Sequence, residues 1–263
     1  MTTYQNILTE IDAGVGIVTL NRPERHNAFD DAMIAELAEV MLSMANDPAV
    51  RVVVISSVGK SFCAGADLAW MQRAAGYDFE QNKADAGMLA EMLRRIAACP
   101  KPVIARVQGP AYGGGVGVIA ACDIAVATFE SRFALTEAKL GLIPAVIGPH
   151  VLAAIGERYA RRYMLTAEAF SAAEAYRIGL LHEMVADEAG LDEAVGEWVE
   201  AILKNGPRAL AECKALVRAI AGRPLDAQLI ETTVESIARV RVAPEGQEGL
   251  AAFLEKRKPN WAN

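Results

Sequence analysis

The stretch YGGGVGVIAACDIAVA, residues 112–127, sets three consecutive glycines and a fourth two positions on before an apolar segment. Glycine is a poor helix former, yet the residues that follow are typical of a helix over 114–121 and a strand over 123–128. Bare backbone at such a turn lets another group approach closely. The stretch therefore predicts a loop–helix–strand unit in which the glycine turn has a role of its own.

The same alternation of strand and helix runs through the first two-thirds of the chain. Apolar β-branched runs predict buried parallel strands, and apolar residues at helical spacing predict the helices between them. Asp30 is a plausible N-cap for the first of these helices. The pattern predicts an α/β fold whose parallel sheet has right-handed crossovers. The predicted strands are 7–12 and 16–20 (a hairpin around Gly14), 51–56 and 102–107, and the predicted helices are 30–46 and 79–98.

Helical patterns dominate after about residue 148, and no flexible linker separates the two parts. We predict a β/α core over residues 1–195 and a helical C-terminal region over 196–263. The second region is expected to pack on the core or on a neighbouring subunit. The helices predicted after the change in character are 148–164, 171–178, 187–204, 207–221 and 225–241.

Composition excludes several classes of function. The formal net charge of −7 argues against nucleic acid as a partner, because phosphate binding needs a basic surface. The longest uncharged runs are broken by Gly and Pro, so no membrane span is expected. The four cysteines lack metal-ligand spacing, no redox-cofactor motif is present, and the N-terminus lacks a signal-peptide pattern. We expect a cytoplasmic protein with free thiols, no metal and no cofactor.

Two glycine-containing loops follow neighbouring strands: SVGKSFCAGADLAWM after 51–56 and QGPAYGGGVGV after 102–107. The second loop does not fit the G-x-G-x-x-G dinucleotide spacing, and the first does not fit a P-loop. Close packing of a helix on the sheet, without chemistry, is one explanation. The other is a pair of backbone N–H donors, one per loop, that converge on an oxyanion. Glu137 follows the next strand and could then act beside them as an acid or base.

The residues FCAGADL (62–68), VQGPAYGGGVGVIAACDIAVA (107–127), FALTEAKLGLIPAVIG (133–148) and FLEKRKPNW (253–261) resemble the enoyl-CoA hydratase/isomerase, or crotonase, family. The similarity spans essentially the whole chain. It implies a crotonase-like β/α spiral core with a helical C-terminal trimerisation region, assembled as a homotrimer or homohexamer. It also implies an acyl-coenzyme A thioester substrate, whose oxygen the N–H groups of Ala66 and Gly114 stabilise.

The resemblance leaves the reaction open at one residue. Typical hydratases of the family use two glutamates; one maps to Glu137 and the other to Gly117, which has no side chain. A glycine there could admit a bulkier acyl group or leave room for a water. We favour an enoyl-CoA hydratase, with a Δ3,Δ2-enoyl-CoA isomerase and a non-catalytic acyl-CoA-binding protein as alternatives. ADLAWMQ (66–72) and residues 140–168 resemble a bacterial subgroup acting on methylglutaconyl-CoA and related isoprenoid acids, so a branched or dicarboxylic acyl group is expected.

The remaining candidates surround these loops. His150 lies near the expected end of the acyl chain and could bind a distal carboxylate or assist proton transfer, although packing at a helix start is the favoured role for it. Cys63 lacks a paired base and is not expected to act as a nucleophile. The predicted substrate-binding residues are Ala64, Asp67, Leu68, Trp70, Met71, Tyr112, Gly113, Gly117, Val146 and His150, and the predicted coenzyme A-binding residues are Arg22, Arg25, Lys60 and Lys256.

Overall fold

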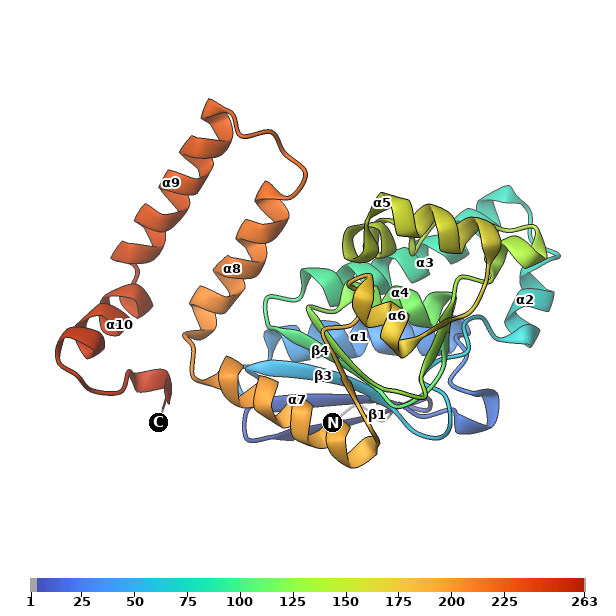
Figure 1. Ribbon diagram of the computed structural model, residues 1–263, viewed down its shortest axis with the longest axis horizontal. Coiled ribbons are helices and arrows are strands. Elements are labelled where there is room, and N and C mark those ends of the chain that lie inside the picture. The colour runs from blue at the N-terminus through green and yellow to red at the C-terminus, as the bar shows by residue number, and fades with distance from the viewer. Residues whose placement is uncertain (1–3, 263) are drawn as a thin grey trace.

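The computed structural model describes residues 4–262 and consists of a β/α core from which C-terminal helices extend (Figure 1). Six strands of this part of the chain form one sheet in the order β1-β2-β3-β4-β6-β9, and a smaller sheet has the order β5-β7-β8. In the large sheet only the β1–β2 pair is antiparallel, which confirms the predicted hairpin and parallel sheet. The strands are β1 (Ile7–Asp12), β2 (Val15–Leu20), β3 (Val52–Ser57), β4 (Val103–Val107), β5 (Ala111–Tyr112), β6 (Ile124–Thr128), β7 (Arg132–Ala134), β8 (Phe170–Ser171) and β9 (Glu183–Val185).

The helices agree with the predicted positions to within a few residues. Asp30 caps α1 as predicted, since its side chain accepts a hydrogen bond from the Met33 N–H at 2.9 Å. The α-helices of the described chain are α1 (Asp31–Asn46), α2 (Leu68–Ala74), α3 (Phe79–Ala98), α4 (Gly114–Ala121), α5 (Gly148–Thr166), α6 (Ala172–Arg177), α7 (Glu188–Leu203), α8 (Pro207–Ile220), α9 (Ala227–Val242) and α10 (Pro244–Leu254). Short 3₁₀ helices lie at Pro23–Arg25, Glu137–Leu140 and Asn260–Ala262.

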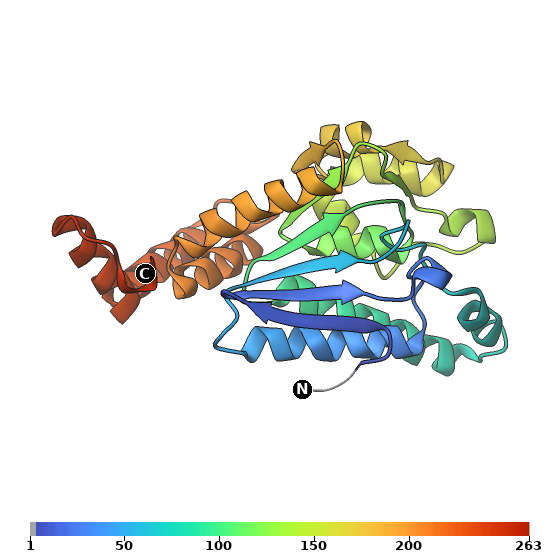
Figure 2. The same cartoon turned by 90° about the horizontal axis from the view of Figure 1, so that it is seen from below.

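Helices cover both faces of the large sheet. All six residues of β3 are buried, and alternate side chains face opposite ways. Val53 and Ile55 belong to the main core with α1 and α3, whereas Val52 and Val54 pack in a second cluster with α7. Figure 2 shows the sheet between α1 and α7. This double coverage is why β3 reads as an unbroken apolar run in the sequence.

The predicted boundary at 195/196 falls inside α7. Leu191 before the boundary and Ile202 after it both pack on the same sheet cluster as Val54. The core of the described chain therefore runs through α7, to about residue 203. Residues 1–3 and 263, at the ends of the two predicted ranges, lie outside the described residues.

The C-terminal helices α8, α9 and α10 project from the core on the side away from α2 (Figures 1 and 2). They carry large apolar side chains that this chain leaves exposed, among them Val217, Val242, Phe253 and Leu254. Two features of the second half were not predicted. Strands β8 and β9 interrupt the helical pattern, and α10 follows α9 after a break at Ala243.

Candidate active site

The two glycine-containing loops lie against each other at the carboxyl edge of the sheet. The Tyr112 N–H donates to the Cys63 carbonyl oxygen at 2.9 Å, and Cys63 also forms an isolated parallel bridge with Ala111. A Cβ atom added to Gly115 would come within 2.6 Å of that same carbonyl oxygen, which no real side chain tolerates. The glycine run is thus required where helix α4 begins, because the first loop passes directly over it.

Each loop supplies one backbone donor. Among the described residues, neither the Ala66 N–H nor the Gly114 N–H has an acceptor, and both residues line the same cavity. Phe29 holds the first donor in place: its N–H donates to the Gly65 carbonyl at 2.7 Å, and its carbonyl accepts from the Asp67 N–H at 2.8 Å. Its ring also lies 3.2 Å from where a Cβ of Gly114 would stand. Two unpaired donors in one cavity can stabilise an oxyanion.

Glu137 completes this group of side chains and donors. It is the first residue of the 3₁₀ helix Glu137–Leu140, and its Oε1 lies 3.0 Å from the position that a Cβ of Gly113 would occupy. Gly113 has φ +49, a backbone conformation that favours glycine, so glycine meets both the steric and the conformational demand. Within residues 4–262, the buried Oε2 of Glu137 has no hydrogen-bond partner. Burial raises the pKa of this carboxyl above its ordinary value.

The cavity has a volume of about 470 Å³, enough for a small acyl chain. Eight of the predicted site residues line it: Ala64, Ala66, Trp70, Met71, Gly113, Gly114, Glu137 and Val146. Some of the lining residues that the sequence patterns missed are neighbours of predicted ones along the chain, and others, such as Phe29 and the α3 residues, lie elsewhere. The missed residues are Phe29, Gly65, Ala74, Asp85, Ala86, Leu89, Thr136, Leu140, Leu142, Ile143, Pro144, Ala145 and Ile147.

Asp67, Leu68, Tyr112 and His150 do not line the cavity. The Asp67 side chain is buried and caps α2 by accepting from the Ala69 and Trp70 N–H groups. Leu68 is exposed, and Tyr112 lies in the short strand β5. His150 lies in the first turn of α5, where burial lowers the pKa of its imidazole. For these residues the structure favours helix capping, surface or packing roles over direct contact with an acyl group.

Gly117 also lies outside the cavity lining, and the two reasons suggested for a glycine there are wrong. A Cβ added at Gly117 would lie 2.3 Å from Cγ2 and 2.8 Å from Cβ of Ile147. Ile147 is 2 % exposed and itself lines the cavity. The isoleucine fills the space that a side chain at 117 would need, so neither a larger acyl group nor a water gains room there.

The four predicted coenzyme A-binding residues are spread over the chain. Arg22 is committed to the fold: its guanidinium pairs with Asp30 at 2.9 Å and with Asp67 at 3.3 Å, which ties together the N-caps of α1 and α2. Arg25, which ends the 3₁₀ helix Pro23–Arg25 after β2, and Lys60, in the loop after β3, are exposed. Lys256 follows α10, which lies on the opposite side of the molecule from α2 (Figure 1). Arg25 and Lys60 therefore remain the candidates that this chain can place near its own cavity.

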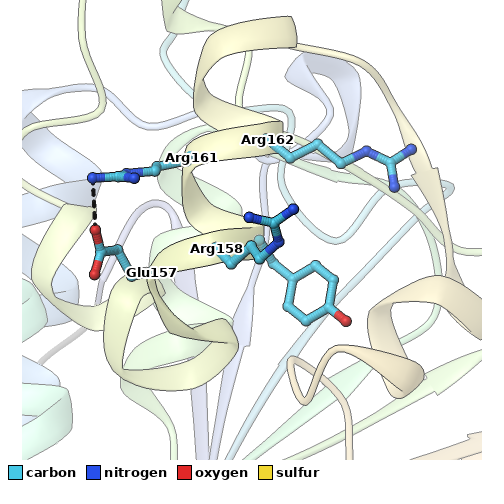
Figure 3. Close-up of a pocket in the computed structure, with 5 residues that line it drawn as sticks. Glu157, Arg158, Arg161 and Arg162 are labelled. Carbon is cyan, nitrogen blue, oxygen red and sulfur yellow. Dashed lines mark ion pairs between the residues drawn. The ribbon is translucent and has the colours of Figure 1, made fainter.

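A second hollow, with arginine side chains, lies on α5 (Figure 3). It follows Gly156, where φ +73 interrupts the helix, and shares no residue with the cavity that holds Glu137. Arg161 pairs with Glu157 at 2.8 Å and Arg162 with Glu168 at 2.7 Å, so these two charges are already compensated. The hollow is a solvated helix surface in this chain.

The other reactive residue types are engaged in the fold. Burial raises the pKa of the Cys63 thiol to about 12, which agrees with the prediction that it is no nucleophile. His26 Nδ1 lies 3.0 Å from the Ser61 hydroxyl, and His182 Nδ1 accepts from the Ala125 N–H at 3.1 Å. No group of three or more potential metal ligands occurs in the described part of the chain. Nor is any described helix long and apolar enough to cross a membrane.

Two backbone N–H groups without acceptors and a buried carboxyl oxygen line one cavity at the edge of the β/α core, an arrangement that can polarise a carbonyl oxygen and move a proton beside it. The family model for enoyl-CoA hydratase/isomerase matches residues 10–263. The chain therefore belongs to the enoyl-CoA hydratase/isomerase family and has the crotonase fold.

Individual relatives agree with this assignment. The crotonyl-CoA hydratase of Syntrophomonas wolfei is 32% identical over 98% of this chain and 98% of its own length. The 1,2-epoxyphenylacetyl-CoA isomerase of Escherichia coli is 34% identical over 97% of each chain. An enoyl-CoA hydratase from Shewanella pealeana, known from a crystal structure, is 43% identical in sequence to this chain. The structural match covers 98% of this chain and 96% of that one, with a TM-score of 0.95. These names span more than one reaction, so the family alone does not choose between hydration and isomerisation.

The unpaired carboxyl of Glu137 gives a prediction for stability. Glu137→Gln should raise the free energy of unfolding at pH 7 by about 1 kcal/mol, because a buried charge without a partner is costly. Since burial raises the pKa of Glu137, the folded protein binds this proton more tightly than the unfolded chain does. Wild-type stability should therefore fall as pH rises from the ordinary value of 4.5 through the folded pKa. Urea unfolding at pH 4 and pH 7 measures this, and an advantage of the variant that is equal at both pH values would contradict it.

Proposed function

We propose that the chain is an enoyl-CoA hydratase, which adds water across the 2,3 double bond of an enoyl-CoA thioester. The Ala66 and Gly114 N–H groups donate to the thioester carbonyl oxygen. Glu137 moves the proton. One observation carries the proposal: the carboxyl oxygen Oε2 of Glu137, buried and without a partner, shares a cavity with two unpaired backbone donors.

In the forward reaction a water oxygen bonds to C3 while the C2–C3 π electrons move toward the carbonyl. The thioester oxygen gains negative charge, which two N–H groups stabilise by an amount worth about two to three orders of magnitude in rate for each donor. Glu137 accepts a proton from the water and delivers it to C2, so water is added with nothing left over. A raised pKa suits a carboxyl that must both take and give a proton near neutral pH.

A Δ3,Δ2-enoyl-CoA isomerase is the second candidate, and the Gly117 region favours it. Ile147 closes the space where a second glutamate would project in two-glutamate hydratases, so Glu137 acts without that partner. Removing a proton from C2 or C4 and returning it to the other carbon needs only one carboxylate. Isomerisation uses the same two donors, since its intermediate is also an enolate-like thioester.

Labelled water separates the two candidates. If the enzyme is a hydratase, a trans-2-enoyl-CoA such as crotonyl-CoA, incubated with it in H₂¹⁸O, should give a 3-hydroxyacyl-CoA whose hydroxyl oxygen is ¹⁸O. Mass spectrometry of the product makes the measurement, with heat-denatured enzyme as the control for uncatalysed addition. If the enzyme instead converts a 3-enoyl-CoA to the 2-enoyl-CoA and forms no labelled hydroxyacyl product, the isomerase assignment replaces the hydratase.

The acyl group is proposed to be short and branched, as in leucine or acyclic terpene breakdown. The volume and largely apolar lining of the cavity support a branched chain. Methylglutaconyl-CoA, the dicarboxylic member of this set, is less well matched to a lining whose charged side chains, among the described residues, are the carboxylates of Asp85 and Glu137.

We also propose that the chain assembles as a homotrimer or homohexamer through its C-terminal helices. Support comes from the apolar residues that α9 and α10 leave exposed, since large exposed apolar patches commonly mark interfaces between subunits. A cytoplasmic location is proposed as well. It is supported by the four free thiols, which suit a reducing compartment.

A further inference from the structure

A second carboxylate lies in the acyl cavity, and the proposed reaction does not use it. Asp85 comes from α3, about one turn before Leu89, and both residues line the cavity that holds Glu137. Among the described lining residues, Asp85 and Glu137 have the only charged side chains, and no Lys, Arg or His is present. Apolar side chains such as Met71, Leu89 and Val146 provide most of the remaining wall.

Asp85 is held in place by Trp70. The indole Nε1–H donates to Asp85 Oδ1 at 3.0 Å, and the Trp70 side chain is buried against the core. Trp70 stands in the first turn of α2, directly after the loop that carries the Ala66 donor. Asp85 forms no ion pair with any described residue, so its charge is not neutralised by this chain. The hydrogen bond therefore fixes an uncompensated carboxylate at the wall of a mostly apolar cavity.

We propose that Asp85 is a specificity-determining residue, which makes the cavity reject acyl chains that end in a carboxylate and favour uncharged ones. This inference rests on the proposed action on enoyl-CoA thioesters. A terminal carboxylate would be placed near two like charges with no cation among the described lining residues to offset them. Like charges about 6 Å apart at an effective dielectric constant of about 20 repel strongly enough to change affinity roughly 100-fold.

A matched pair of substrates tests the proposal. Pent-2-enoyl-CoA and glutaconyl-CoA have acyl chains of equal length and differ only in whether a methyl or a carboxylate ends the chain. In the wild type, kcat/KM for pent-2-enoyl-CoA should exceed kcat/KM for glutaconyl-CoA by roughly 10- to 100-fold. Asp85→Asn should reduce the ratio at least tenfold by raising kcat/KM for glutaconyl-CoA. Asparagine keeps an oxygen to accept the Trp70 N–H, so the change removes the charge and keeps the hydrogen bond.

Two further variants separate charge from structure. Glu80→Gln removes an exposed charge from the same helix outside the cavity, and it should leave the substrate ratio at the wild-type value. Trp70→Phe removes the hydrogen bond that holds Asp85 but keeps its charge, so discrimination against glutaconyl-CoA should weaken less than in Asp85→Asn. Three results would overturn the proposal: a wild-type preference for glutaconyl-CoA, an unchanged ratio in Asp85→Asn, or an equal large loss on both substrates in that variant.

Binding of unreactive esters keeps this test independent of the reaction itself. Pentanoyl-CoA should bind the wild type at least tenfold more tightly than glutaryl-CoA. Asp85→Asn should reduce the ratio of the two dissociation constants. Calorimetry measures both affinities without turnover. If neither enoyl ester is turned over, the proposed hydratase function fails while the affinities still decide the role of Asp85. If turnover occurs but the two saturated esters bind equally, the specificity proposal fails alone.

Discussion

Replacing Glu137 by glutamine is expected to lower kcat/KM for crotonyl-CoA by about three orders of magnitude. Glutamine has nearly the same shape as glutamate, but its amide cannot accept a proton from water or return one to carbon. The two backbone donors are untouched by the change, so carbonyl polarisation should persist and account for the residual rate. The loss should appear mainly in kcat, because the interaction that is removed acts in the transition state.

The binding of a saturated ester distinguishes lost chemistry from lost folding. Glu137→Gln should bind butyryl-CoA with an affinity close to that of the wild type and should unfold in a single cooperative transition. Glu130→Gln, an exposed change in the turn between β6 and β7, provides the matched control and should retain wild-type turnover. Full activity of Glu137→Gln on both crotonyl-CoA and methylglutaconyl-CoA would remove Glu137 from the catalytic assignment.

Much of the fold could be predicted because its signals are local. The β3 run is apolar on both faces since α1 and α7 cover both faces, and Asp30 precedes its helix as an N-cap should. The very short strands gave no such signal. β5 and β8 have two residues each, and pairing with β7 rather than their own sequence defines them. Strand patterns need several residues of alternation before they can be distinguished from loops.

The parts of the site that depend on the path of the backbone could be predicted from the sequence. The parts that depend on which contacts a side chain makes in the folded protein could be predicted less well. The two loops that would carry the donors follow from their positions after neighbouring strands, whereas Ala66 and Gly114 themselves were assigned through the family resemblance. Glu137 follows from the return of the chain to the same sheet edge. Asp67 and Arg22 looked available in sequence, but they pair with each other. Asp67 also accepts from the Ala69 N–H at the start of α2, and Arg22 donates to the Ala28 carbonyl oxygen. Ile147 could not be placed against Gly117 because 30 residues separate the two along the chain and only tertiary packing joins them.

Gly117 and Gly115, two residues apart on α4, need to be glycine for different reasons. The neighbour of Gly117 is the Ile147 side chain, which can shift or be replaced together with it. The neighbours of Gly115 are the carbonyl oxygen and the Cβ of Cys63, at 2.6 and 2.8 Å from the position of an added Cβ. The Cys63 carbonyl is also the acceptor of the Tyr112 N–H, the contact that aligns the two glycine-containing loops. A side chain at 115 therefore acts on the backbone that positions the donors.

Gly115→Ala should accordingly reduce both stability and activity. Overpacking against backbone should lower the free energy of unfolding by roughly 2–3 kcal/mol. Separating the loops should misplace one of the two N–H donors and lower kcat by about two orders of magnitude.

Gly196→Ala in α7 is the matched control. An added Cβ there meets nothing within 4 Å, and alanine is the better helix former, so stability should rise by about 0.5–1 kcal/mol without loss of turnover. Denaturant melts and steady-state rates of both variants make the comparison. Normal turnover in a folded Gly115→Ala protein would show that contact between the loops does not set the oxyanion geometry.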